Sequence, residues 1–522
     1  MRFLFLFFTI FQLSIVAGFA KATADRSRVL LVRPIILCDD DGTNPARHAL
    51  PKKLADQVYT RADLEFLYLD PIPWNHGKAR RGEINLNTIV SSGIKNGMIT
   101  TDPRVATLLF VSGVDGQTQP LGRGLQGGNI CFVNLGTPDK MKNPAERAFV
   151  VAHEQGHCLS LIHAVDDPKV PNDVPNLQGD GPYEERLAVE GLHPTQVETV
   201  IKSPLALLRL QFLNTKETAE AIANDQWDNP LEPLTADNFR FELGLEVDAP
   251  LPEDQAARVA IAREKYAALA RDFSEDEIET LTTLVNKLDG LVRDRWPMIQ
   301  RVPWQFAKMD STFCRAMPHT RGLTIVLTES CFQRFSGDES LALEILLHEK
   351  LHVLQRLMPK RFATSFARYG YQSVKLPPDT AKRFNFVRNP DAPDARWSIR
   401  LETGLNLLAT SLETEEGQLK FVEHSYLLQP AGENETDHSH TVGDPQEPGE
   451  EMIKWRQQFP IKVGHDDPRE VMAYLLGKIF RADLLEEADE ELTPSQVQLL
   501  KDERPHLRKI LSSRADRARK IR

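Results

Sequence analysis

The sequence predicts an α+β protein with an N-terminal mixed sheet packed with helices and a largely helical C-terminal domain with a small sheet. Three observations lead to this prediction. The chain has 522 residues and 41% hydrophobic content, enough for two or three separate cores. Apolar, strand-like runs alternate with helical patterns over residues 28–212, and helical periodicity dominates after residue 253. Residues 214–252 between them are polar and contain prolines, which is typical of a linker or irregular connection.

The first element is an N-terminal apolar segment, which reads MRFLFLFFTIFQLSIVAGFA before KATADR. A basic start, an apolar run and small residues before Asp25 are the layout of a secretory signal peptide, which we assign to residues 1–24. Export to the medium or the cell envelope is therefore expected. Membrane association is expected only if this apolar segment stays uncleaved.

A first domain is expected over residues 25–213. Short apolar runs predict its strands, and apolar residues three or four apart predict its helices. The expected strands are residues 28–37, 64–69, 106–114 and 129–136, and the expected helices are residues 50–61 and 143–159. The strand at 129–136 is interpreted as an edge strand leading into the helix at 143–159.

A second domain is expected over residues 253–522. Its expected helices are residues 252–273, 274–294 and 338–357, with a last helical set beginning at residue 466. One strand is expected at residues 322–331. Residues 389–397 and 430–451 are polar and rich in proline and glycine, so we expect loops there.

Charge and cysteine content limit the classes of function. The formal net charge is −11, and an acidic chain is poorly suited to bind nucleic acid. Five cysteines are too few for a disulfide scaffold, and an odd number cannot all pair within the chain. Cys314 and Cys331 bracket an expected turn and strand and are the first pair to test for a disulfide, whereas Cys158 is expected to be a buried free thiol.

Residues 153–163 read HEQGHCLSLIH and carry the first chemical motif. His153 and His157 are four apart, so on a helix both imidazoles project from one face and can share a zinc ion. Glu154 is placed to take a proton from water activated by that zinc. His163 can be a third ligand only if the chain leaves the helix after His157 and bends back, because an unbroken helix would turn it away.

This stretch resembles the zinc-binding motif of the metzincin peptidases, HExxHxxGxxH. The resemblance implies that His153, His157 and His163 are zinc ligands and that Glu154 is the general base. Two positions depart from the family pattern: Ser160 stands where the family has glycine, and Gln178, in NLQGDGP, stands where the family has the methionine of its Met-turn. Residues 193–208 correspond to the closing helix of the family, so the resemblance covers about residues 28–212.

A second copy of the spacing, HEKLH, lies at residues 348–352. His348 and His352 again share one helical face and Glu349 lies between them, so a second zinc site is expected. The segment resembles the gluzincin pattern of zinc peptidases, which implies a third ligand from a glutamate on a later helix. Glu470 is the preferred candidate.

Glu470 has a second interpretation. Asp467 to Glu470 fits a capping box, in which the glutamate would only satisfy a backbone donor. If Glu470 is not the ligand, Asp391, Glu402 or Glu423 could supply it.

Together these patterns predict two zincin-like modules in an exported zinc metallopeptidase. Each module would bind one Zn²⁺, hydrolyse a peptide bond of a protein or peptide substrate with zinc-activated water, and use Glu154 or Glu349 as its general base. The alternative is an exported binding or scaffolding protein in which one or both modules are catalytically inactive.

Overall fold

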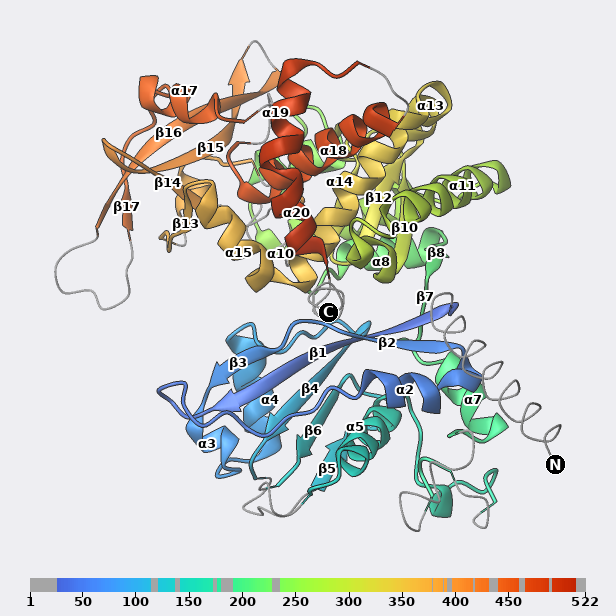
Figure 1. Cartoon of the computed structure of the whole chain (residues 1–522). Helices are drawn as coiled ribbons and strands as arrows, with labels where there is room; N and C mark the ends of the chain where they lie inside the picture. The colour runs from blue at the N-terminus through green and yellow to red at the C-terminus, as the bar shows by residue number, and fades with distance from the viewer. Residues whose placement is uncertain are drawn as a thin grey trace. The chain divides into compact units, whose positions relative to one another are not determined.

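The structure is a computed structural model and describes most of the chain (Figure 1). The described residues are 26–113, 121–136, 141–171, 176–179, 191–227, 235–377, 379–387, 389–391, 397–415, 418–430, 440–459, 465–487 and 491–512. The predicted signal peptide at residues 1–24 lies outside them. The chain divides into two compact units, residues 1–209 and 210–522, and each contains helices and sheets, which confirms the α+β class.

The first unit is built on a seven-stranded mixed sheet with the order β2-β1-β4-β6-β5, to which β3 and β7 add by pairing with β1. β5 runs antiparallel to β6, and β7 runs antiparallel to β1; the other pairs are parallel. The strands are β1 (Arg28–Cys38), β2 (Leu64–Tyr68), β3 (Ile72–Asn75), β4 (Val105–Val111), β5 (Leu121–Gly124), β6 (Ile130–Asn134) and β7 (Leu207–Leu208).

The edge strand of this sheet differs from the prediction. The strand expected at the edge, residues 129–136, is β6, and it pairs on both sides, with β4 and β5. The edge belongs to β5, a four-residue strand that the sequence did not reveal because LGRG carries almost no strand-forming side chains.

Helices cover both faces of this sheet, as Figure 1 shows. On one face, α2, α5 and α7 pack around a core that includes Phe66, Phe110 and Phe149. On the other, α3 and α4 pack around Trp74 and Phe132. The helical segments are α2 (Lys52–Val58), η1 (Thr60–Ala62), α3 (Gly77–Arg80), α4 (Leu86–Lys95), α5 (Pro144–Cys158), η2 (Ala164–Asp166) and α7 (Pro194–Ile201).

The second unit starts earlier than the sequence indicated. Residues 210–212, expected in the first domain, form β8 (Leu210–Phe212) and pair with β10 (Trp304–Met309) of the second unit. The predicted linker at residues 214–252 contains two helices, α8 (Thr215–Ala223) and α9 (Ala236–Leu243). A side-chain cap begins each helix, and apolar residues of both helices pack in the core of this unit. The polar composition of the segment therefore did not indicate a linker.

The predicted long helices of the second unit are present, and two five-stranded sheets accompany them. The helical segments are α10 (Gln255–Leu269), α11 (Glu275–Val292), α12 (Pro297–Arg301), η3 (Phe313–Ala316), α13 (Glu329–Gly337), α14 (Glu339–Leu357), α15 (Pro359–Arg368), α16 (Thr380–Arg383), α17 (Glu450–Arg456), α18 (Pro468–Glu487), α19 (Pro494–Asp502) and α20 (Arg504–Leu511). The longest of them, α14 and α18, pack against each other (Figure 1).

One sheet has the order β11-β12-β10-β8 with β9 beside β10, and the other has the order β13-β14-β15-β16-β17. The remaining strands are β9 (Ala270–Arg271), β11 (His319–Arg321), β12 (Thr324–Thr328), β13 (Tyr371–Ser373), β14 (Trp397–Leu401), β15 (Gly404–Glu415), β16 (Gln418–Pro430) and β17 (His440–Val442). The second of these sheets was not predicted: its longest strands, β15 and β16, lie between the loops expected at residues 389–397 and 430–451, and β17 lies within the second of those expected loops.

All five cysteines are buried free thiols, as expected for Cys158. Cys314 and Cys331, the pair named for a disulfide test, are not bonded to each other: the Cys331 thiol lies 3.4 Å from the Thr328 hydroxyl. Within the described part of the chain, no helix combines the length and apolar character needed to cross a membrane.

Two candidate metal centres

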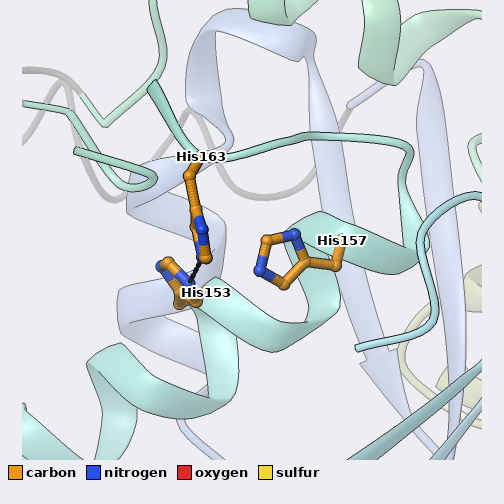
Figure 2. A group of neighbouring side chains, drawn as sticks. All are labelled: His153, His157 and His163. Carbon is orange, nitrogen blue, oxygen red and sulfur yellow. Dashed lines mark hydrogen bonds between the residues drawn. The ribbon is translucent and has the colours of Figure 1, made fainter. Parts of the chain in front are cut away.

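The first candidate centre is formed by His153, His157 and His163 (Figure 2). Asn143 caps the start of α5 by accepting a hydrogen bond from the Ala145 N–H, which sets the helix on which two of the three histidines lie. His153 and His157 project from the same side of α5, and His163 approaches them from the segment beyond the helix. Their potential ligand atoms all lie within 4.8 Å of one another.

The chain leaves the helix where the third ligand requires it. Ser160 has a φ of +71°, in the left-handed region that glycine occupies more readily. Its N–H donates to the His157 carbonyl at 2.9 Å, and the Leu161 N–H donates to the Gly156 carbonyl at 2.9 Å. These bonds close the end of α5 and stabilise a left-handed residue without glycine, so the bend that His163 needs is present.

Backbone carbonyls orient two of the imidazoles. His153 Nδ1 lies 2.9 Å from the Leu177 carbonyl and His157 Nδ1 lies 2.7 Å from the Leu161 carbonyl. A carbonyl only accepts, so both Nδ1 atoms carry hydrogen and each Nε2 can use its lone pair for a metal. Burial also lowers the pKa of His157, which favours the neutral form that a metal requires.

The spacing of two of the nitrogens suits ligands of one small metal ion. Two ligands of one tetrahedral zinc, each at the usual bond length, lie about 3.3 Å apart. His153 Nε2 and His163 Nε2 are 3.3 Å apart. Three imidazoles also match the preference of zinc for nitrogen ligands, and the side chain of His163 is 51% exposed, so this centre is open to solvent.

Glu154 lies beside this centre and is held by the edge strand β5. Its side chain is buried, and its Oε2 accepts a hydrogen bond from the Gly124 N–H at 2.6 Å. Burial raises the pKa of Glu154 to about 7, although the Gly124 N–H opposes the rise by stabilising the carboxylate.

Two glycines allow β5 to lie close against α5. A Cβ at Gly122 would lie 2.3 Å from the Glu154 carboxyl carbon, and one at Gly124 would lie 2.5 Å from His157 Cβ. The sequence analysis missed both residues. Their signal was the alternation of glycines in LGRG just before the strand that leads to the motif.

Gln178, at the position of the family's methionine, contacts the same helix. Its amide donates to the His153 carbonyl at 2.9 Å. A Cβ at Gly156 would lie 2.3 Å from the Gln178 amide nitrogen, so the amide packs directly against the helix. Gln178 therefore supports the centre through a hydrogen bond where the family has a thioether.

The second candidate centre brings together His348, His352 and Glu470. Its ligand atoms have spacings close to those of the first centre: the two Nε2 atoms are 3.1 Å apart, Glu470 Oε2 is 3.3 Å from His348 and Glu470 Oε1 is 3.6 Å from His352. Burial alone would raise the pKa of Glu470, but His352 and His348 hold it well below its usual range.

The capping interpretation of Glu470 is not supported by its contacts. Asp467 accepts the backbone bond at the start of α18, from the Arg469 N–H at 2.8 Å. The carboxylate of Glu470 faces the two histidines and the amide of Asn389. Of the other candidates, Glu423 pairs with Arg456 and Glu402 is exposed.

Glu349 occupies a different environment from Glu154. Its side chain is buried, its Oε2 has no hydrogen-bond partner, and Asp391 lies close enough to form a group with Glu349 and His352. Burial, followed by the charges of Asp391 and Glu470, raises the pKa of Glu349 well above its usual value. An orphaned buried carboxyl oxygen beside a set of metal-type ligands is consistent with a cation at this centre.

The two centres also differ in exposure. The side chains of His348, His352 and Glu470 are 14%, 0% and 8% exposed, against 51% for His163 at the first centre. Catalytic zinc sites keep one position open to water or substrate, whereas structural sites are closed. By this criterion the first centre is the better candidate for catalysis.

Comparisons with known proteins add no assignment. A scan against models of protein families found no match, and a search of curated proteins found none either. The argument for function therefore depends on the residues and geometry of the two centres.

Proposed function

We propose that the protein is a zinc-dependent metallopeptidase and that the first centre carries the catalysis. The observation that supports this most strongly is the convergence of His153, His157 and His163 beside the buried carboxyl of Glu154. When bound, zinc supplies Lewis-acid chemistry, polarising a carbonyl oxygen and making water more acidic. The similarity of HEQGHCLSLIH to the metzincin motif supports the same assignment.

In this proposal Glu154 is the general base. It takes a proton from the attacking water and later gives it to the leaving amine. A pKa near neutrality suits both steps, because the group can accept and release a proton at the same pH. The Gly124 N–H donates to Glu154 Oε2 and so orients the carboxyl group for the two transfers.

The edge strand β5 supports a peptide as the substrate. It pairs with β6 on one side and ends the described sheet on the other, while Gly122 and Gly124 bring it against Glu154 and His157. An extended peptide can add to such an edge through backbone hydrogen bonds, which would place its carbonyl beside the zinc ligands.

For the second centre we propose a zinc ion with a structural role. Its low exposure favours this assignment over a second active site. Because His348 and His352 lie on α14 and Glu470 on α18, an ion there would join two helices that pack against each other. If both centres proved inactive, the protein would be an exported binding or scaffolding protein.

The test compares Glu154→Gln with Glu349→Gln in assays of peptide hydrolysis. Removing a general base costs about 10²- to 10⁴-fold in rate. We expect that loss for Glu154→Gln with zinc content unchanged, and near-parental activity for Glu349→Gln. Activity that survives Glu154→Gln would contradict the assignment of the first centre, and loss in Glu349→Gln alone would move catalysis to the second.

A further inference from the structure

We infer that Gln355 is a positioning residue that orients His352 and couples it to the helix supplying Glu470. This inference rests on the proposed zinc ion at the second centre and extends it to residues outside the ligand set. Gln355 lies three residues after His352 on α14 and is buried. Its side-chain amide is hydrogen-bonded on both sides.

The direction of each bond follows from the partners. The Gln355 amide nitrogen donates to the Arg469 carbonyl at 3.0 Å, and a carbonyl can only accept. The Gln355 Oε1 must therefore face His352 Nδ1, which lies 3.0 Å away and must carry the hydrogen. His352 Nε2 is left as the nitrogen that meets a metal, and it is the one that faces Glu470 and His348.

The second hydrogen-bond partner of Gln355, the Arg469 carbonyl, links the side chain to a second helix. Arg469 is adjacent in sequence to Glu470, within the first turn of α18. One amide thus fixes the ring of a ligand on α14 and the backbone beside a ligand on α18. A shift of α18 along α14 would therefore break the hydrogen bond between Gln355 and Arg469 and, at the same time, move Glu470 away from His352.

Asn389 holds the other side of the centre in the same manner. Its amide nitrogen donates to Glu470 Oε1 at 2.7 Å, and its Oδ1 accepts from the Asp391 N–H at 2.9 Å. Two carboxamides therefore position one ligand from each helix. At the first centre, backbone carbonyls bond two of the ligand rings, whereas at the second centre the corresponding contacts come from side chains that can be substituted.

The experiment measures zinc affinity in the full chain carrying His157→Ala, so that the second centre alone is titrated against a competing chelator. Gln355→Met fills similar volume but cannot bond, and we expect 10- to 100-fold weaker zinc binding, the usual effect of removing such a contact. Gln355→Glu keeps an acceptor for His352 Nδ1–H but loses the donor to the Arg469 carbonyl, so it should restore only part of the affinity. Gln333→Met, at an exposed glutamine on α13, is the matched control and should change nothing.

The melting temperature without zinc separates positioning from packing. A purely structural role predicts that Gln355→Met lowers the melting temperature of the metal-free protein while zinc affinity stays at the parental value, which would overturn the inference. If Gln355→Met does not fold, Asn389→Leu removes the equivalent hydrogen bond to Glu470. Unchanged zinc affinity in Asn389→Leu would contradict the inference that carboxamides position the ligands. A parental chain that binds no zinc at this centre would refute the proposed second zinc site itself.

Discussion

The conformation of one residue, Ser160, determines whether His163 can reach the other two histidines of the first centre. The left-handed conformation of a non-glycine residue costs about 1 kcal/mol, and at Ser160 two backbone hydrogen bonds around the bend offset that cost. The consequence is that His163 returns to within 3.3 Å of His153 without the family's glycine. The absence of glycine in the motif is therefore compatible with the ligand geometry.

His319 is a residue whose protonation should make the second unit sensitive to acid. It is buried in β11, its Nδ1 bonds the Met317 carbonyl, and its Nε2 has no partner. Burial, assisted by Arg321, lowers its pKa to about 4, while Asp391 and Glu242 act in the opposite direction. The unfolded chain binds the proton near pH 6.5, so between pH 6.5 and 4 protons favour unfolding.

The free energy of unfolding should therefore fall as the pH drops through this window, and His319 should contribute about 3 kcal/mol of that fall. His319→Gln keeps a donor for the Met317 carbonyl but does not titrate. Denaturant unfolding at pH 7, 5.5 and 4 should show a shallower pH dependence in this variant. Parallel stability curves for the two proteins would contradict the prediction.

Among the secondary-structure elements, the approach of β5 to α5 determines the environment of Glu154, the proposed general base. The contact depends on the missing side chains of Gly122 and Gly124 and on one backbone N–H that donates to Glu154. The sequence analysis placed the helix correctly and chose the wrong edge strand. A four-residue strand has too little pattern of its own, and its pairing with β6 exists only in the folded sheet.

Gly122→Ala should disturb the contact between β5 and the proposed general base, Glu154. The new methyl group would lie 2.3 Å from the Glu154 carboxyl carbon, so either the strand or the carboxylate must move. We expect peptide hydrolysis to fall by about 10²-fold or more while zinc is retained. Gly290→Ala is the control, because a Cβ there meets nothing within 4 Å and alanine favours the helix. Full activity in Gly122→Ala would show that β5 does not position Glu154.

In the whole molecule, each compact unit contains one motif helix and its own candidate metal centre. α5 carries two ligands in the first unit, and α14 with α18 carries three in the second. No residue belongs to both sets. Metal binding at one centre should therefore be independent of the other, since effects at sites without shared partners usually add.

Elemental analysis of the purified protein should find two equivalents of zinc. His157→Ala and His352→Ala should each retain one, and removal of zinc with a chelator should abolish hydrolysis through the first centre. If the parent protein contains only one equivalent of zinc, the variant that loses this zinc identifies the centre that binds it. No zinc after reconstitution would favour the scaffold alternative.

Local features follow from the sequence alone: the α+β class, the long helices α5, α14 and α18, and the histidine pairs four residues apart on one helical face. These depend on periodicity within a short window, which sequence alone contains. The tertiary structure decided the edge strand beside Glu154, the sheet between residues 371 and 442, and the return of His163. It also brought Asn389 and Gln355 to the second centre, because contacts between residues 81 to 114 positions apart depend on how the chain packs and cannot be read from local periodicity.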